Sequence, residues 1–323
     1  MKIVILDADP AFGSAAAPSQ SRGTVEISRL QRLGELTVHE GTLPEQVLER
    51  AKDADVLITN KVVLREDHFE KLPSLKLVTV LATGVNVVAL DAAAARNITV
   101  CNVPGYSTAS TAQHAIALLL ELTNRVGLHE ADVASGAWAR SAAFSYFKTP
   151  LEELDGKTFG VVGFGAIGQR TASIARALGM HVLAHTRTRR DAFDVEFVEK
   201  KCLLERSDVV SLHCPLTEQT KHFIDAPALA TMKKSALLIN VSRGPVVDET
   251  ALAAALQTRQ IAGAATDVLS QEAPAADNAL TNSPFCIVTP HVAWASQAAR
   301  ERLVHITAEN IESFVQGTPQ NVV

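Results

Sequence analysis

The chain has 323 residues, enough for about two domains, and its 47% apolar content allows a large core, which excludes a disordered or fibrous protein. Its 30 basic and 35 acidic side chains give a formal charge of −5 without long runs of one sign, so we expect neither a nucleic-acid partner nor a membrane surface. The longest apolar runs, such as residues 115–120, are far too short to span a bilayer.

The first third of the chain alternates short β-branched apolar runs with helical stretches, a pattern typical of a parallel sheet covered by helices. Its first seven residues predict a strand, because the apolar region and the cleavage site of a signal peptide are missing. We expect strands over residues 3–6, 36–39, 56–59, 77–81 and 99–102, and helices over residues 25–33, 44–51, 69–71 and 90–96.

A longer helix is expected over residues 111–126, and a second set of alternating units begins near residue 154. Its strands are predicted over residues 158–162, 181–184, 209–213, 237–240, 264–268 and 287–289, with helices over residues 167–178, 203–205, 226–232, 249–257 and 296–316. Two such sets predict an α/β fold of two doubly wound, Rossmann-like domains, with a cleft lined by the carboxyl ends of their strands. Four aromatic residues between the sets predict an interface or core cluster, or one ring in the active site: Trp138, Phe144, Tyr146 and Phe147.

A glycine-rich segment, Gly163-Phe164-Gly165-Ala166-Ile167-Gly168, lies between a predicted strand and a predicted helix. In that context the pattern GxGxxG strongly indicates a dinucleotide site, although a glycine-rich turn without a ligand is the alternative. Gly163 permits a tight turn, Gly165 lets the backbone approach a pyrophosphate, and Gly168 lets the helix lie close to the strand. The helix start at Ala166 and Ile167 then offers free amides to the phosphate.

The next predicted strand bears on the choice between NAD and NADP. An NAD site places Asp or Glu at its end, about 20 residues after the glycines, to hold the ribose hydroxyls. Here Thr186 stands at that position and Arg187, Arg189 and Arg190 follow it. Threonine and arginine side chains bind a 2′-phosphate that a carboxylate would repel, so the sequence favours NADP over NAD. The alternative is a solvated basic loop in an enzyme that uses either cofactor.

Three polar residues that could carry catalytic chemistry follow three successive predicted strands. Arg243, Glu272 and His291 occur in that order, each just past the end of a strand. Taken alone, Arg243 indicates an ion pair, Glu272 a solvated loop carboxylate and His291 a structural histidine. Together, behind a dinucleotide motif, they suit the reduction of a 2-keto acid: histidine donates the proton, a carboxylate on its second ring nitrogen fixes the tautomer and favours the imidazolium, and arginine binds the substrate carboxylate.

These segments resemble the D-isomer-specific 2-hydroxyacid dehydrogenases over nearly the whole chain. The motifs that carry the resemblance are residues 162–168, 214–220, 240–244, 267–272 and 289–291. The resemblance implies that Arg243, Glu272 and His291 are catalytic, and that Thr83, Gly84, Val85, Arg243, His291 and Trp294 bind the substrate. For the cofactor it implies, beside the glycine motif and the Thr186 loop, Pro215, Thr217, Thr220, Val241, Ser242, Arg243, Asp267 and His291.

Within that family the segments around residues 102–108, 113–114 and 291–296 look most like glycerate dehydrogenases, which are hydroxypyruvate and glyoxylate reductases. This implies a substrate domain of residues 1–100 and 291–323, a dinucleotide domain of residues 101–290, a homodimer and a small 2-keto or 2-hydroxy acid as substrate. Thr186 in place of an acid, and Val87-Val88-Ala89 after the carboxylate loop, depart from the usual pattern.

Two other functions stay open: an NAD-dependent D-lactate-type dehydrogenase, and a non-catalytic, corepressor-like sensor that binds the dinucleotide. Four widely spaced cysteines without a CxxC pair indicate reduced thiols and no metal site, so we expect a cytoplasmic protein.

Overall fold

The computed structural model describes residues 1–9, 11, 25–188 and 194–323, which form two compact units. The discontinuous unit comprises residues 1–107 and 295–323, and the continuous unit comprises residues 108–294. Within the described residues, no helix has the length and apolar character needed to cross a membrane.

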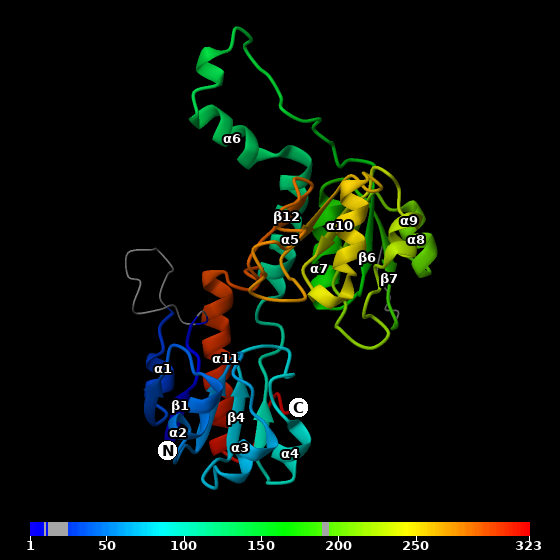
Figure 1. The fold of residues 1–323 in the computed structure, drawn as a ribbon. Coiled ribbons are helices and arrows are strands. Elements are labelled where there is room, and N and C mark those ends of the chain that lie inside the picture. Colours follow the sequence, from blue (N-terminus) through cyan, green and yellow to red (C-terminus); the bar gives the residue numbers. More distant parts are fainter. Residues whose placement is uncertain (10, 12–24, 189–193) are drawn as a thin grey trace. The chain divides into compact units, whose positions relative to one another are not determined.

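The discontinuous unit is built on a five-stranded parallel sheet in the order β2-β1-β3-β4-β5 (Figure 1). Its strands are β1 (Lys2–Ile5), β2 (Glu35–Val38), β3 (Val56–Thr59), β4 (Leu77–Val80) and β5 (Thr99–Cys101). Its helices are α1 (Ser28–Gln31), η1 (Pro44–Gln46), α2 (Val47–Arg50), α3 (Glu66–Glu70), α4 (Leu90–Ala94) and α11 (Gln297–Val315). Helices α2, α3 and α4 share one core with the sheet, and α11 packs on β4 and α1.

The continuous unit is built on a seven-stranded parallel sheet in the order β12-β11-β10-β9-β6-β7-β8. Its strands are β6 (Thr158–Val162), β7 (His181–His185), β8 (Val195–Phe197), β9 (Val209–Leu212), β10 (Leu237–Asn240), β11 (Gly263–Thr266) and β12 (Cys286–Val288). Its helices are α5 (Thr108–Asn124), α6 (Val126–Ala134), η2 (Trp138–Arg140), α7 (Ala166–Ala177), α8 (Lys200–Arg206), α9 (Ala226–Thr231), η3 (Gly244–Val246) and α10 (Glu249–Gln257).

Both faces of this second sheet are covered, as the nearly continuous apolar character of its strands requires. Alternate strand residues point to opposite faces, so Phe159 and Val161 pack with α5 and α7 while Val210 and Leu212 pack with α8, α9 and α10. The two parallel, helix-covered sheets confirm the predicted fold class.

The structure differs from the predicted elements around residue 125 and before residue 198. Helix α5 ends at Asn124 because Arg125 takes a left-handed backbone with φ of 49°, and the unpredicted helix α6 follows. The three residues of β8 were also not predicted, because so short a run carries no periodic signal. The aromatic cluster before β6 does not form a core within the chain: Phe144 is 92% exposed and Phe147 is 73% exposed.

Candidate active site

The predicted functional segments of the continuous unit follow strands that lie side by side. Strands β12, β11, β10, β9, β6 and β7 are neighbours in that order and run parallel. Their carboxyl ends therefore meet at one edge of the sheet, which is where ligands bind in folds of this kind. The segments that begin at residues 163, 186, 213, 241, 267 and 289 all start at this edge.

The glycine motif forms a tight turn between β6 and α7. Gly163 has a φ of +90°, and a Cβ there would lie 2.6 Å from the Cys214 nitrogen, so the turn fits only glycine. A Cβ on Gly168 would lie 2.1 Å from the Gly163 carbonyl oxygen, so helix and turn are in close contact. By contrast, nothing lies within 4 Å of a Cβ built on Gly165, at the N-terminus of the 12-residue helix α7. This open space beside free helix amides fits a dinucleotide pyrophosphate.

A cavity of about 720 Å³ adjoins this turn. It is lined by the first two glycines of the motif and by the ends of β7 and β9, and the predicted cofactor residues among its lining are Gly163, Gly165, Thr186, Arg187, Pro215, Thr217 and Thr220. Thr186 is half-buried and Arg187 is exposed. Arg189, predicted to act with them, lies outside the described residues, as does Arg190.

One wall of this cavity is a short loop after β9 that is fixed by its own hydrogen bonds. The Thr220 hydroxyl donates to the Pro215 carbonyl over 2.6 Å and accepts from the Thr217 amide over 2.7 Å. At the start of the loop, burial lowers the pKa of His213 to about 3, so this imidazole is neutral at physiological pH, and its Nε2 lies 2.9 Å from the Ser211 hydroxyl. The cavity wall therefore carries hydroxyl groups and a neutral ring.

Arg243 sits on a turn that Asn240, the last residue of β10, holds in place. The Asn240 side chain accepts from the Ser242 amide over 3.0 Å and donates to the Arg243 carbonyl over 2.9 Å. A Cβ on Gly244 would lie 2.1 Å from the Leu269 carbonyl carbon, so this turn packs directly on the segment that follows β11. The Arg243 side chain itself is exposed, so its guanidinium is accessible to a ligand.

His291 and Glu272 form a hydrogen-bonded pair, as predicted for a proton donor and its orienting carboxylate. The His291 Nδ1 lies 2.8 Å from the Glu272 Oε2, and the Leu269 amide donates to the Glu272 Oε1 over 3.2 Å. Because an ionised carboxylate only accepts hydrogen bonds, Nδ1 carries a hydrogen and Nε2 is the atom left for proton transfer. Both side chains are partly exposed, so a substrate can reach the ring.

Asp267 anchors the turn on which His291 lies. Its carboxylate accepts from the Val292 amide over 2.9 Å and from the Ala293 amide over 2.8 Å, and its carbonyl accepts from the His291 amide over 2.9 Å. Burial disfavours the charged carboxylate, but hydrogen bonds from His114, Thr289 and these amides outweigh it and hold the pKa of Asp267 below its usual range. The contact with His114 was not predicted, because a histidine on an apolar helix gives no sequence signal for it.

The remaining predicted substrate residues belong to both units. Trp294 is in the continuous unit, directly after the turn anchored by Asp267. Thr83, Gly84 and Val85 are in the discontinuous unit, in the loop after β4. This loop is held at its base, because the Thr83 hydroxyl donates to the Val103 carbonyl over 3.1 Å and the Asn102 side chain donates to the Thr83 carbonyl over 2.8 Å.

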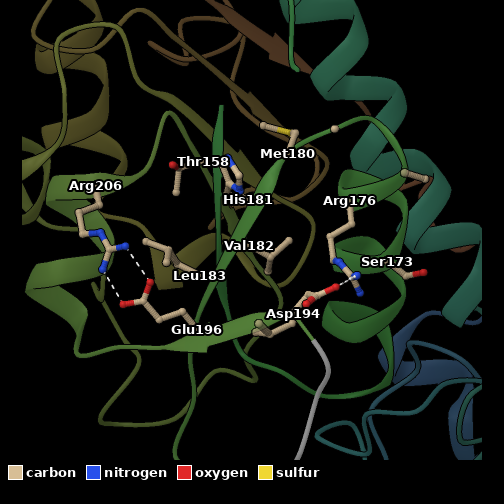
Figure 2. A pocket seen from close by; sticks show the side chains of 13 residues that line it. Thr158, Ser173, Arg176, Met180, His181, Val182, Leu183, Asp194, Glu196 and Arg206 are labelled. Atoms are coloured by element: carbon tan, nitrogen blue, oxygen red, sulfur yellow. Dashed lines mark hydrogen bonds and ion pairs between the residues drawn. The ribbon is translucent and has the colours of Figure 1, made fainter. Parts of the chain in front are cut away.

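A wider hollow of about 1020 Å³ lies along the β7–β8 edge of the same sheet (Figure 2). Its charged side chains are engaged with one another in two ion pairs, Arg206 with Glu196 at 2.7 Å and Arg176 with Asp194. The hollow reaches the amino ends of β6 and β7, whereas ligands of such sheets bind at the carboxyl ends. The glycine turn, and not this larger hollow, is therefore the candidate active site.

Known proteins with similar sequences identify the family of this chain. Residues 116–293, more than half of the chain, match the model of the D-isomer specific 2-hydroxyacid dehydrogenase, NAD binding domain. The chain is 42% identical over 329 residues to a hydroxypyruvate reductase of Blautia hydrogenotrophica, with 100% of this chain and 99% of that protein covered. It is 43% identical over 283 residues to a glycerate dehydrogenase of Methylorubrum extorquens, with 87% and 88% covered.

The fold also matches solved structures. An acyclic imino acid reductase in complex with NADPH and D-Arg superposes with a TM-score of 0.86 at 28% identity, with both chains covered completely. The glycine turn, the His291–Glu272 pair and these similarities together show that the chain belongs to the D-isomer specific 2-hydroxyacid dehydrogenases.

Proposed function

We propose that this protein reduces a small 2-keto acid, hydroxypyruvate or glyoxylate, to D-glycerate or glycolate. The observation that carries the proposal is the 2.8 Å contact between His291 and Glu272 at the sheet edge where the glycine turn also lies. A carboxylate on Nδ1 orients the ring and stabilises its protonated form, which suits a proton donor. The names of the relatives in Blautia hydrogenotrophica and Methylorubrum extorquens support this choice of substrate.

A nicotinamide dinucleotide held at the glycine turn and the 720 Å³ cavity would supply the hydride for C2 of the keto acid. Arg243 binds the substrate carboxylate through its planar guanidinium and polarises the ketone. His291 donates the proton on Nε2 to the ketone oxygen, so that a hydroxyl group forms and a neutral imidazole is left. Glu272 accepts from Nδ1 throughout, which keeps the ring oriented and stabilises its protonated form.

The other proposed contacts position the two ligands. We assign the backbone amides of Thr83, Gly84 and Val85 to the substrate carboxylate and the ring of Trp294 to the substrate pocket. Ala166, Ile167, Val241 and Ser242 are assigned to the cofactor with the lining of the 720 Å³ cavity, and Asp267 to its nicotinamide side. In this proposal the discontinuous unit binds substrate and the continuous unit binds the dinucleotide.

We propose NADP as the preferred cofactor, although NAD fits the same turn. Thr186 carries no charge that would repel a 2′-phosphate, and Arg187 beside it lines the cavity. Because Arg187 is exposed, salt weakens its attraction, and we expect a preference of about tenfold rather than the larger factor of a shielded contact.

The double variant Thr186→Asp, Arg187→Ala tests this preference. The new carboxylate repels the phosphate and the lost guanidinium no longer attracts it, so kcat/KM should favour NADH by about tenfold or more. Steady-state kinetics with both cofactors at moderate salt measures the ratio. Equal use of NADH and NADPH by the unmodified protein would show that the arginine loop is only solvated surface.

We also propose that the protein is a homodimer. The arm (residues 126–150) lies beyond the end of α5 (Figure 1). It exposes large apolar side chains that a monomer would leave in water: Val126, Leu128, Val133, Trp138, Phe144 and Phe147. The Tyr146 hydroxyl donates to Asp132 over 2.6 Å, so the arm holds a defined shape in which a second copy can cover these groups.

One panel of assays tests the enzymatic proposal. The purified protein is mixed with glyoxylate, hydroxypyruvate or pyruvate, each with NADH and with NADPH, and oxidation of the cofactor is followed at 340 nm. We expect the highest kcat/KM with hydroxypyruvate or glyoxylate. A higher value with pyruvate would favour a D-lactate-type dehydrogenase, and binding of the dinucleotide without turnover of any substrate would indicate a sensor.

The expected cytoplasmic location rests on the four cysteines, all of them free thiols.

A further inference from the structure

Asp267 contacts His114 of helix α5 both directly and through the Thr289 side chain. The carboxylate is 1% exposed, and its Oδ1 lies 2.6 Å from the Thr289 hydroxyl and 3.4 Å from the His114 Nε2. His114 Nε2 lies 3.0 Å from the same Thr289 hydroxyl oxygen. Three polar groups from α5, the end of β11 and the end of β12 thus form one small triangle.

The hydrogen atoms of this triangle can be assigned from the chemistry of the groups. A threonine hydroxyl has one hydrogen, and the ionised Asp267 carboxylate can only accept, so Thr289 donates to Asp267. The Thr289 oxygen then accepts from His114, which requires a hydrogen on Nε2. The same Nε2 lies 3.4 Å from the Asp267 Oδ1, so the His114 side chain contacts both Thr289 and Asp267.

A second contact from α5 reaches the same turn. The Ser110 hydroxyl donates to the Ala293 carbonyl over 2.7 Å. Ser110 and His114 are four residues apart, so they lie on the same face of the helix, one turn from each other. Helix α5 therefore holds the turn of residues 289–293 at both ends, and this turn carries the histidine to which we assign proton transfer.

The backbone conformation of His291 explains why this turn needs contacts from α5. Its φ of 53° lies in the left-handed region, which a non-glycine residue occupies only where neighbouring contacts hold it. The Val292 and Ala293 amides that bind Asp267 follow directly, so a shift of Asp267 moves the imidazole. A displacement of about 1 Å at a reacting group can lower a rate by about 100-fold.

We propose that His114 is a positioning residue for catalysis, which acts through Thr289 and Asp267 to hold the imidazole of His291 where it meets the substrate. The proposal rests on the proposed role of His291 as proton donor. His114 touches neither substrate nor cofactor in this role.

The test compares His114→Leu with His114→Gln. Glutamine places an amide N–H at about the reach of Nε2 and retains the contact, whereas leucine fills the space without a donor. Gln113→Leu, at the exposed neighbouring position on α5, controls for the added apolar residue. We expect His114→Leu to lower kcat by about 10- to 100-fold, with the dinucleotide Kd within about twofold, and His114→Gln to recover most of the loss.

A second pair probes the other corner of the triangle. Thr289→Val removes the hydroxyl at nearly constant volume, whereas Thr289→Ser keeps it. The losses of kcat in His114→Leu and Thr289→Val should be strongly non-additive in the double variant, because both act through Asp267. Additive losses would show that the two residues do not work as one unit.

Amide hydrogen exchange, read by mass spectrometry on peptides covering residues 289–296, separates this inference from the proposed function. Faster exchange there in His114→Leu, but not in Gln113→Leu, supports the positioning role even if no 2-keto acid is turned over. Unchanged exchange in His114→Leu overturns the inference, and so does wild-type kcat in that variant while the unmodified protein reduces hydroxypyruvate. In either case the enzymatic proposal stands or fails by its own assay.

Discussion

His291 combines a reactive side chain with a demanding backbone. Its left-handed φ of 53° is fixed by the neighbouring amides on Asp267, and its ring is fixed by Glu272. Asparagine and histidine occupy the left-handed region more readily than most residues, so asparagine can take the same backbone without a protonatable ring. The position therefore allows chemistry and folding to be separated experimentally.

His291→Asn should lower kcat for reduction of the 2-keto acid by about 100- to 10,000-fold, because the general acid is lost. The dinucleotide Kd should stay within about twofold and the Tm within a few degrees, because the glycine turn and the left-handed backbone are unchanged. Stopped-flow kinetics, fluorescence titration and thermal melts give the three values. His305→Asn, an exposed histidine on α11, is the matched control. Near-normal turnover in His291→Asn would remove His291 from the mechanism.

At the scale of elements, the β6–α7 turn shows two different demands on glycine. Gly163 needs glycine because of its positive φ and the nearby Cys214 nitrogen, whereas a methyl group on Gly165 would meet open space. The first glycine is a folding requirement. The second is not required by packing within the chain and is explained by a ligand that approaches the backbone.

This difference predicts opposite outcomes for two alanine variants. Gly163→Ala should lower the free energy of unfolding by about 2 kcal/mol or more, because the methyl group meets backbone that cannot move and the φ is unfavourable. Gly165→Ala should leave the free energy of unfolding within about 0.5 kcal/mol but weaken dinucleotide binding by about tenfold or more. Urea unfolding and fluorescence titration on both variants check this. Unimpaired binding in Gly165→Ala would contradict a phosphate at this turn.

The turn after β12 is held by the charged carboxylate of Asp267, which accepts hydrogen bonds from its amides. Since the pKa of the Asp267 carboxyl is lowered in the folded protein, its contribution to stability is present above the ordinary carboxyl pKa and is lost as the pH falls through the folded value. Asp267→Asn should cost about 2–4 kcal/mol at pH 7, because the amide nitrogen faces donors. Urea unfolding at pH 7, 5 and 3.5 should show this difference shrinking below about pH 4. A difference that is constant with pH would mean that the lost charge is not the cause.

Much of this element-level arrangement could be predicted from the sequence. The strand–turn–helix pattern around the glycines predicted β6 and α7. Polar residues directly after β10, β11 and β12 indicated the edge of the sheet at which ligands bind. The role of His114 could not be predicted, because its partner Thr289 is 175 residues away and only the packed fold brings them together. Helix α6 was missed as well, since none of its residues is buried within the chain and its sequence carries no core-facing pattern.

At the scale of the whole molecule, the most unusual surface is the arm. Phe144 is 92% exposed and Phe147 is 73% exposed, so two large aromatic rings lie in water close together in the sequence. The hydrogen bond between Tyr146 and Asp132 nevertheless fixes the arm in this conformation. An apolar projection of this kind fits an interface between copies, because stable interfaces bury an apolar centre within a polar rim.

Phe144→Ser together with Phe147→Ser should convert a dimer into a monomer, because the double variant removes the two most exposed of the large apolar side chains of the arm. Sedimentation velocity at micromolar concentration measures the change, and circular dichroism confirms that the fold is kept. Replacement of the exposed Leu43, in the discontinuous unit, by serine should leave the sedimentation coefficient unaltered. An unmodified protein that sediments as a monomer would contradict the homodimer.

The split of the discontinuous unit has a consequence for synthesis on the ribosome. Its last strand ends at Cys101, but helix α11, which packs on β4, begins only at Gln297. At roughly 5–20 residues per second, the intervening chain takes about 10–40 s to emerge. During that time one face of the first sheet lacks its covering helix, while the elements of the continuous unit emerge one after another and are complete just before α11. Translation order thus lets the continuous unit complete its sheet before the first sheet receives α11, and an apolar face of the first sheet stays uncovered until then.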